Sequence, residues 1–190
     1  MLRPIYPIDT ARLRLRPFRP DDLEALLGIQ SREDVTRFLY WGTRTHDDVQ
    51  AVLSERLRQD ALTGEGDKLI LAVERRDTGA VIGDVNLVWL SRENRQGETG
   101  FVLHPDHHGN GFAHEAADVM LRLGFEELGL HRIIGRCDGR NTASTKVMEK
   151  LGMRREAHFR QNEIVKGEWS DEIVYALLAD EWKVAQGMRP

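Results

Sequence analysis

The sequence of 190 residues contains one cysteine, Cys137, and no long apolar run. A single thiol can form neither an internal disulfide nor a multi-thiolate metal site, which suits a reducing compartment. The longest apolar stretches, such as residues 173–179, are far too short to cross a bilayer. The arginine-rich first residues are followed by no apolar core of a signal peptide. We therefore expect a cytoplasmic protein that does not bind membranes.

A large excess of charge of one sign is also absent, since the formal net charge is only -4. Proteins that act on nucleic acid usually present a strongly basic face, so general nucleic-acid binding is not expected. The composition, 41% apolar and 31% charged, is that of a folded chain. Because the sequence has no internal repeat, low-complexity segment or flexible linker, residues 1–190 are predicted to form a single domain. The sequence leaves the oligomeric state open, a homodimer included.

The hydrophobic periodicity predicts an α+β fold with a mostly antiparallel sheet of about seven strands and helices on both faces. Strands are predicted over residues 12–16, 69–73, 80–89, 98–103, 132–137, 154–159 and 171–178. Helices are predicted from residue 21 onward and over residues 45–62, 110–128 and 141–151. Thr45 and Asn141 suit helix N-caps, and Gly129 and Gly152 suit the positions beyond helix ends.

Residues 100–113 form the most informative segment, where a predicted strand runs through a glycine-bearing turn into a helix. The first turn of a helix has unpaired N–H donors and positive partial charge, so it attracts anions. Gly109 and Gly111 lack Cβ atoms, and Ala113 is small, so a ligand such as a diphosphate can approach the backbone closely. A turn without any ligand would show the same pattern. A dinucleotide fingerprint is disfavoured because His114 stands where its third glycine belongs, and the Gly-Lys-Ser/Thr of a mononucleotide loop is absent.

A second segment, residues 130–153, predicts a strand followed by a helix that Asn141 caps. Ala143, Val147 and Leu151 are predicted to share the buried face of this helix. Taken alone, Ser144 reads equally well as a solvated hydroxyl in the first turn.

The two segments together resemble the GCN5-related N-acetyltransferase (GNAT) superfamily. The coenzyme A motif of that family, Gln/Arg-x-x-Gly-x-Gly/Ala, corresponds to residues 108–113, with His108 where Gln or Arg is usual. The Asn-x-x-Ser pattern at Asn141 and Ser144, followed by Lys-Leu-Gly-Met at residues 150–153, is similar to the RimJ/RimL-like branch. The resemblance extends from Thr10 to Trp182.

The resemblance implies an enzyme that uses acetyl-CoA, without a metal, to acetylate an amine by direct attack. It implies that Glu98 is the catalytic base, directly or through water, and that Ser144 protonates the departing thiolate. A carboxylate among apolar neighbours can serve as a base near neutral pH, although an exposed glutamate at a strand edge would look the same in the sequence. A β-bulge near residues 101–103 could also free an amide for the carbonyl oxygen. The residues expected to bind the coenzyme are Phe101, Val102, Leu103, His108, Gly109, Asn110, Gly111, Phe112, Ala113, Asn141, Ser144 and Lys146.

The remaining candidates carry less weight. Cys137 is interpreted as a packing residue within a strand. His104, His107, His108 and His114 are not expected to form a metal site, because adjacent histidines diverge. Trp41 is a candidate for the wall of the acceptor pocket, although a lone aromatic is more often packing. The acceptor is left open between a protein N-terminus and a small amine such as a polyamine or an aminoglycoside, and a silent coenzyme A-binding sensor is a further alternative.

Overall fold

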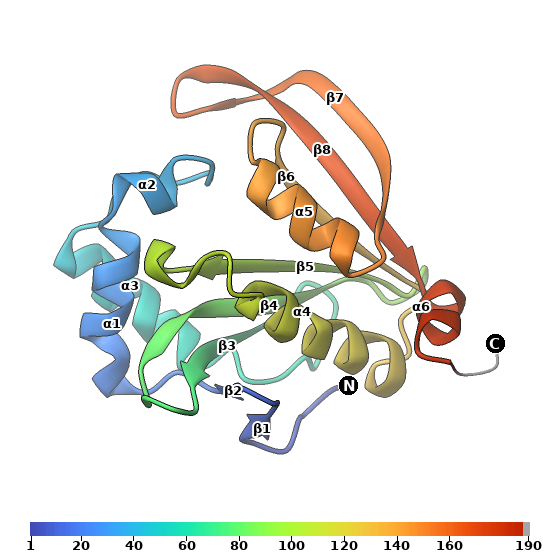
Figure 1. The fold of residues 1–190 in the computed structure, drawn as a ribbon, viewed down its shortest axis with the longest axis horizontal. Helices are drawn as coiled ribbons and strands as arrows, with labels where there is room; N and C mark the ends of the chain where they lie inside the picture. Colours follow the sequence, from blue (N-terminus) through green and yellow to red (C-terminus); the bar gives the residue numbers. More distant parts are fainter. Residues whose placement is uncertain (188–190) are drawn as a thin grey trace.

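The computed structural model describes residues 1–187, through which one eight-stranded sheet runs (Figure 1). The strands are β1 (Ile8–Asp9), β2 (Leu13–Arg16), β3 (Lys68–Arg75), β4 (Val81–Ser91), β5 (Gln96–Leu103), β6 (Arg132–Asp138), β7 (Arg154–Val165) and β8 (Glu168–Leu178). They are ordered β1-β2-β3-β4-β5-β6-β8-β7, and only the β5–β6 pair is parallel. The predicted α+β class is confirmed. The additional strand, β1, has only two residues and so carries no periodic pattern.

Six α-helices connect the strands within the described residues. They are α1 (Leu23–Gln30), α2 (Glu33–Thr36), α3 (His46–Arg56), α4 (Phe112–Arg122), α5 (Thr142–Lys150) and α6 (Ala179–Ala185). Two 3-10 turns, Pro20–Asp22 and Pro105–His107, and a π-helical stretch, Leu123–Glu127, complete the connections. The sequence analysis missed α2 and α6, which are too short to show a helical period.

Helices cover both faces of the sheet, and the alternation along β3 shows why. Leu71 and Val73 lie in a large apolar cluster that includes Met120 of α4. Ala72, between them, lies in a second cluster with Leu26 of α1 and Leu53 of α3. Since neighbouring strand residues point to opposite faces, α4 packs on one face and α1 with α3 on the other. The apolar run over residues 69–73 is therefore a strand buried on both faces, as predicted.

Two helix boundaries differ from the predictions. Thr45 caps α3 as expected, since its hydroxyl accepts from the N–H of Asp48, but α3 ends at Arg56 instead of residue 62. Leu62 instead pairs with Leu2 in an isolated β-bridge and is fully buried. The predicted helix over residues 110–128 begins only at Phe112, because Gly111 adopts a left-handed conformation with φ of 80°.

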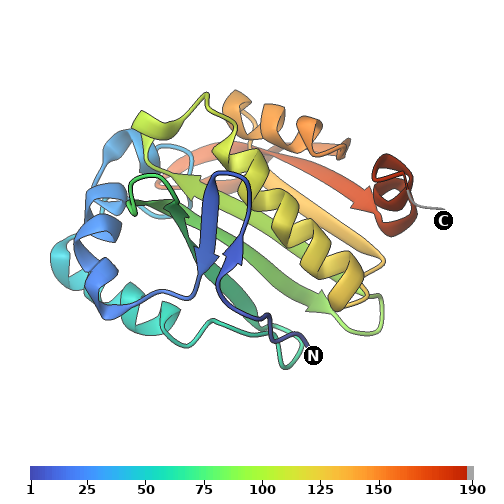
Figure 2. The ribbon, with the colours of Figure 1, turned by 60° about the horizontal axis from the view of Figure 1, so that its bottom comes forward.

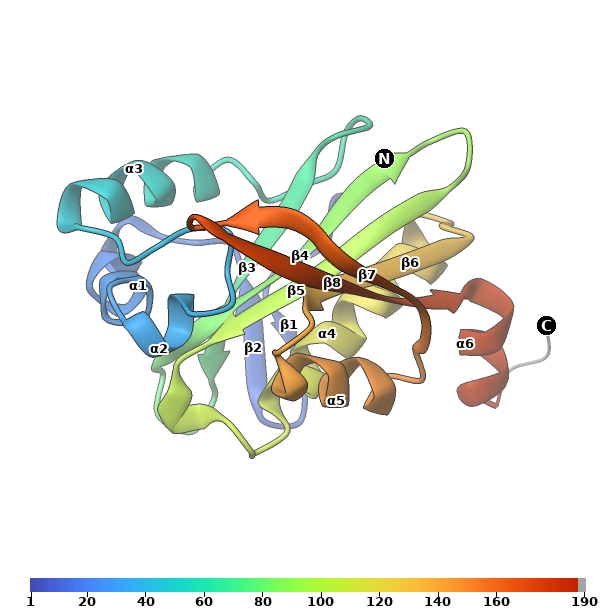
Figure 3. The same cartoon turned by 90° about the horizontal axis from the view of Figure 1, so that it is seen from above.

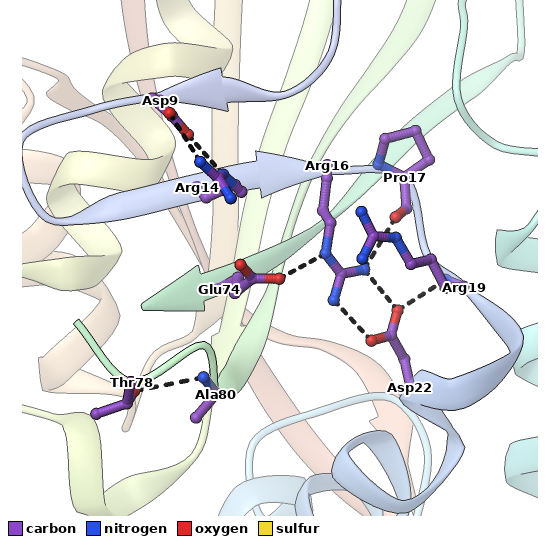
Figure 4. Close-up of polar contacts among 9 residues, drawn as sticks. All are labelled: Asp9, Arg14, Arg16, Pro17, Arg19, Asp22, Glu74, Thr78 and Ala80. Carbon is purple, nitrogen blue, oxygen red and sulfur yellow. Dashed lines mark hydrogen bonds and ion pairs between the residues drawn. The ribbon is translucent and has the colours of Figure 1, made fainter. Parts of the chain in front are cut away.

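The beginning of α1 is held by a buried ion-pair network. The guanidinium of Arg16 donates to both carboxylate oxygens of Asp22 at 2.7 and 2.8 Å and to Glu74 at 2.7 Å (Figure 4). The sequence predicts a helix that begins at Asp21 and Asp22 but not this network. The side chain of Asp22 is 5% exposed, so the network joins β2 and β3 to α1.

The last hairpin, β7–β8, extends further than the predicted strands, and its tip reaches α2 (Figure 3). Lys166 at the tip donates to the backbone carbonyls of Thr36 and Arg37 at 2.6 and 3.3 Å. A lysine there also complements the negative end of the short helix. The contact places the hairpin across the segment that follows α2.

Candidate active site

The sheet opens between its two parallel strands, and this opening positions the site. β5 pairs with β6 only through residues 96–98, opposite residues 132–134. Beyond Glu98 the strands separate, whereas β5 remains paired with β4 as far as Leu103. Figure 1 shows β5 and β8 close together near α6 and apart near α2.

The separation leaves backbone groups of β5 without a neighbouring strand. The N–H of His104 donates to Ile82, so the ladder to β4 uses the even-numbered residues of β5. Because backbone groups alternate in direction along a strand, those of Phe101 and Leu103 point toward the gap. The pairing of β4 with β5 is regular here, since its irregularity lies at residues 89–91. The expected bulge near residues 101–103 is therefore wrong, and the strand separation frees the amides instead.

The turn between β5 and α4 presents a row of free amides. Gly109 and Gly111 have φ of 76° and 80°, a conformation that glycine adopts without strain. Among the described residues, no acceptor pairs with any of the six N–H groups from Gly109 to His114. Three of these groups begin α4, where the helix dipole adds positive partial charge. The arrangement presents backbone donors of the kind that suit an anion.

Side chains engage the carbonyl groups around the same turn. His108, in the tautomer that carries a proton on Nε2, donates to the carbonyl of Leu103 at 2.9 Å. The amide of Asn110 donates to the carbonyl of His108 at 3.0 Å. Because these two carbonyl oxygens already accept hydrogen bonds from side chains, the N–H groups are the main polar groups of the turn that remain unpaired. The side chain of His108 thus links the turn to the end of β5. In the family that the sequence resembles, glutamine or arginine is usual at this position.

Helix α5 forms the opposite wall. Asn141 caps it by accepting from the N–H of Ser144 at 3.1 Å, as predicted. Ser144 is half-buried and lines the cleft, whereas Lys146 lies at the cleft with an exposed side chain. The predicted buried face of α5 is partly wrong: Leu151 is buried, but Ala143 is exposed at the cleft and Met148 fills the core instead.

The cleft between these walls has a volume of about 720 Å³. It brings together eleven of the twelve residues predicted to bind a coenzyme: Phe101, Val102, Leu103, His108, Gly109, Gly111, Phe112, Ala113, Asn141, Ser144 and Lys146. Asn110 does not line it. The side chain of Asn110 points back to the turn's own carbonyls, as described above.

The end of the cleft is closed by the segment around α2, which the sequence analysis did not assign. Val35, Phe38 and Leu39 line this end. Trp41, the predicted wall residue, does not line the cleft. The guanidinium of Arg44 instead stacks on its ring at 4.0 Å from the centroid. The apolar residues just before Trp41 were the signal that could have identified the wall.

Glu98 lies on the face of the sheet that α1 and α3 cover, because it alternates with Gly97 and Thr99, which are buried on the α4 side. It is paired with β4 and with β6, so the interpretation as an exposed glutamate at a strand edge is wrong. Arg136 of β6 reaches across the opening, and its Nε and Nη2 each lie 3.1 Å from Oε2 of Glu98. Glu98 is therefore an ion-paired carboxylate at the closed end of the opening.

Further polar groups gather around this ion pair. Arg136 also donates to buried Glu172 of β8 at 3.2 Å, and Glu172 accepts from the amide of Asn162 at 3.2 Å. Tyr40 lies nearby, and burial together with the charges of Glu163 and Glu172 raises the pKa of its hydroxyl to about 12. Arg136, Glu172, Asn162 and Tyr40 were not predicted, because they meet only through tertiary contacts between the hairpin, β6 and the α2 segment.

Two expectations concern residues outside this arrangement. Cys137 is buried in β6, and burial raises the pKa of its thiol to about 11, which fits the predicted packing role. Over residues 1–187, the histidine, cysteine and acidic side chains form no group of three or more that could hold a metal ion. None of the helices in that range is long and apolar enough to span a membrane.

Comparison with known proteins places this geometry in a family. Residues 12–154 match the model of the acetyltransferase (GNAT) domain. The chain is 37% identical over 176 residues to the uncharacterized N-acetyltransferase YnaD of Bacillus subtilis, covering 92% of this chain and 98% of that protein. It superimposes with a TM-score of 0.80 and 33% identity on the crystal structure of a GNAT-family acetyltransferase from Bacillus anthracis, covering 91% and 98% of the two chains. A more distant relative is the spermidine N(1)-acetyltransferase of Escherichia coli, 22% identical over 161 residues, with coverage of 85% and 83%.

Proposed function

The chain belongs to the acetyltransferase (GNAT) family, and from this premise we propose that it transfers the acetyl group of acetyl-CoA directly to a primary amine. The enzyme class follows from the family: the protein is an acetyl-CoA-dependent N-acetyltransferase. The proposal adds the direct mechanism, the roles of individual residues and the nature of the acceptor.

The observation that carries the proposal is the row of six free N–H groups from Gly109 to His114 at the start of α4. Such a row suits the diphosphate of the coenzyme, because backbone donors and the helix dipole both favour negative charge. The backbone groups of Phe101 and the N–H of Leu103 suit the amides of the pantetheine arm, which would lie along β5 toward Ser144. The residues present therefore fit acetyl-CoA.

Glu98 and Ser144 are the proposed catalytic residues. Glu98 takes the proton that the attacking amine loses, directly or through water. The nitrogen of the neutral amine then forms a bond to the carbonyl carbon while the carbon–sulfur bond breaks. The nitrogen gives its remaining extra proton to water, and Ser144 gives its hydroxyl proton to the departing sulfur and regains one from water. A free β5 amide is positioned to stabilise the carbonyl oxygen. Buried Cys137, with its raised pKa, is a poor candidate for a covalent nucleophile, which supports direct attack.

For the acceptor, we propose a protein N-terminal α-amine, together with membership in the RimJ/RimL-like branch. The support is the Asn141-x-x-Ser144 pattern, now seen at the cleft. The apolar side chains of Val35, Phe38 and Leu39 at the α2 end of the cleft would contact the first residues of such a chain.

A small polycation is the second candidate acceptor. Glu98, Glu163 and Glu172 lie on the same side of the sheet, and the charges of the last two act on Tyr40. Arg136 pairs with Glu98 and Glu172 and is their one ion-pair partner over residues 1–187. Carboxylates attract an ammonium group and its charged neighbours. The distant relationship to a spermidine acetyltransferase supports this candidate.

The experiment is a panel of acceptors assayed by mass spectrometry with acetyl-CoA. Peptides with free N-termini are compared with the same peptides blocked at the N-terminus, and with spermidine, spermine and an aminoglycoside. Acetylation of free peptides alone supports the first acceptor, and acetylation of polyamines alone supports the second. Failure to acetylate any amine, despite coenzyme binding, would contradict the proposed direct transfer to an amine.

A further inference from the structure

We propose that Arg12 is a positioning residue for the coenzyme: it fixes the Gly109–Gly111 turn with its amides facing the cleft and thereby sets the affinity for the diphosphate. The inference rests on the proposed function, because it concerns the same ligand. It adds a residue from the N-terminal hairpin, outside both segments that carry the family resemblance.

Arg12 lies in the turn between β1 and β2, beside the beginning of α4 (Figure 2). Its Nε and Nη2 both lie 2.7 Å from Oε2 of Glu115, and its backbone N–H donates to Oε1 of Glu115 at 2.8 Å. Its Nη1 donates to the backbone carbonyl of Asn110 at 2.8 Å. One side chain thus joins the hairpin to the first turn of α4 and to the middle of the glycine turn.

Glu115 is a firm anchor for this contact. Its side chain is only 15% exposed, and the hydroxyl of Thr10 donates to Oε1 at 2.6 Å. Burial alone would raise the pKa of Glu115, but hydrogen bonds from Thr10 and Arg12 hold it below its usual value. The carboxylate is therefore ionised at neutral pH and keeps the guanidinium in a fixed orientation.

The contact with Asn110 engages one more carbonyl of the glycine turn. The carbonyls of Leu103 and His108 are occupied by side-chain donors, and Arg12 occupies that of Asn110. A free carbonyl oxygen near a diphosphate would repel it, whereas a bonded one is partly neutralised. Arg12 also brings positive charge to the outer side of the same turn.

Packing around Arg12 indicates that the turn and the guanidinium fit each other closely. The guanidinium lies over the ring of Phe112, the first residue of α4, at 4.7 Å from the centroid. A Cβ at Gly111 would lie 3.4 Å from Nη2 of Arg12. That distance is an ordinary van der Waals contact, so the left-handed conformation is what requires glycine here, and the arginine lies directly against the turn.

The test compares Arg12→Gln with Arg14→Gln, a matched control. Arg14 lies on the adjacent strand β2 and also grips a carboxylate with two nitrogens, since its Nε and Nη2 donate to Asp9 at 2.9 and 3.1 Å, but it has no contact with the turn. Binding of acetyl-CoA is measured by calorimetry. Transfer rates are measured with acetyl-CoA and with S-acetylpantetheine, which has the thioester arm but no diphosphate. Arg12→Lys is included because it restores the charge without the fork geometry.

We expect Arg12→Gln to weaken acetyl-CoA binding about tenfold, the equivalent of one lost hydrogen bond to a charged group. The kcat at saturating acetyl-CoA and the rate with S-acetylpantetheine should stay unchanged in Arg12→Gln. The acetyl-CoA affinity of Arg12→Lys should lie between those of Arg12→Gln and the wild type, and that of Arg14→Gln should match the wild type.

Equal acetyl-CoA affinity in wild type and Arg12→Gln would overturn the inference. So would an equal loss with both thioesters, which would indicate a purely structural ion pair. If Arg12→Gln does not fold, Arg12→Lys decides: wild-type affinity there overturns the inference. Absence of acetyl-CoA binding by the wild type would instead contradict the proposed function itself.

Discussion

Two arginines of β2, Arg14 and Arg16, each pair with an aspartate, and the two pairs differ in burial (Figure 4). They allow a direct measurement of how burial changes the contribution of an ion pair to stability. Arg16 and Asp22 are 6% and 5% exposed, whereas Arg14 and Asp9 are 40% and 37% exposed. In both pairs the guanidinium makes two hydrogen bonds to the carboxylate. The perturbation is Asp22→Asn, with Asp9→Asn as its control.

The expected cost follows from the contacts. Asp22 accepts from Nη1 and Nη2 of Arg16 and, at 2.7 Å, from the N–H of Arg19. Breaking a buried pair costs about 3–5 kcal/mol, because the partner charge remains buried. Asparagine keeps one acceptor oxygen, and Glu74 still pairs with Arg16, so we expect about 3 kcal/mol, the lower end of that range. For a chain of this size, that lowers Tm by about 6–12 °C.

Thermal unfolding followed by circular dichroism, with urea unfolding as a check, measures both variants. Asp9→Asn should melt close to the wild type, because exposed pairs contribute little. Burial would not increase the contribution of an ion pair to stability if Asp22→Asn and the wild type had equal Tm values, or if Asp22→Asn and Asp9→Asn lowered Tm equally.

The other predictions concern the site. Glu98→Gln should lower kcat about 100-fold or more while leaving the Kd of acetyl-CoA unchanged, because a positioned base contributes on that scale; a loss of coenzyme affinity in calorimetry would assign Glu98 a structural role. Ser144→Ala should lower kcat about 100-fold, the lower end of what a general acid contributes, with stability and coenzyme affinity retained, since the cap of α5 is Asn141 and not the serine hydroxyl; an unchanged kcat in an assay of thiol release would remove Ser144 from the mechanism. Cys137 should resist alkylation at pH 8 in the folded protein and react after unfolding, because burial keeps its pKa near 11 and its thiol protonated; rapid labelling of the native protein, seen as an intact-mass shift, would contradict that.

The sequence predicted well those features that local patterning determines. The apolar run at residues 69–73, the caps Thr45 and Asn141 and the glycine turn before α4 all depend on short-range periodicity or backbone preference. The fold class followed from the order of such segments. The boundary at Phe112 was missed because the left-handed conformation of Gly111 is a property of the assembled turn.

What escaped prediction depends on contacts between distant segments. Arg136 is unremarkable within its strand, and its bridge from Glu98 to Glu172 exists only because β5 and β6 separate. Arg12 looks like one member of an alternating strand until the fold places Glu115 beside it. Trp41 attracted attention as a large aromatic residue, yet its neighbour Phe38 lines the cleft.

Amide NMR during a titration with coenzyme A shows directly whether the free amides of residues 109–114 hold the coenzyme diphosphate. We predict that the largest shifts of backbone N–H resonances occur at Gly109, Gly111 and the first residues of α4, with smaller shifts at Phe101 and Leu103. Saturation of the protein with coenzyme A while these resonances remain unmoved would contradict the account.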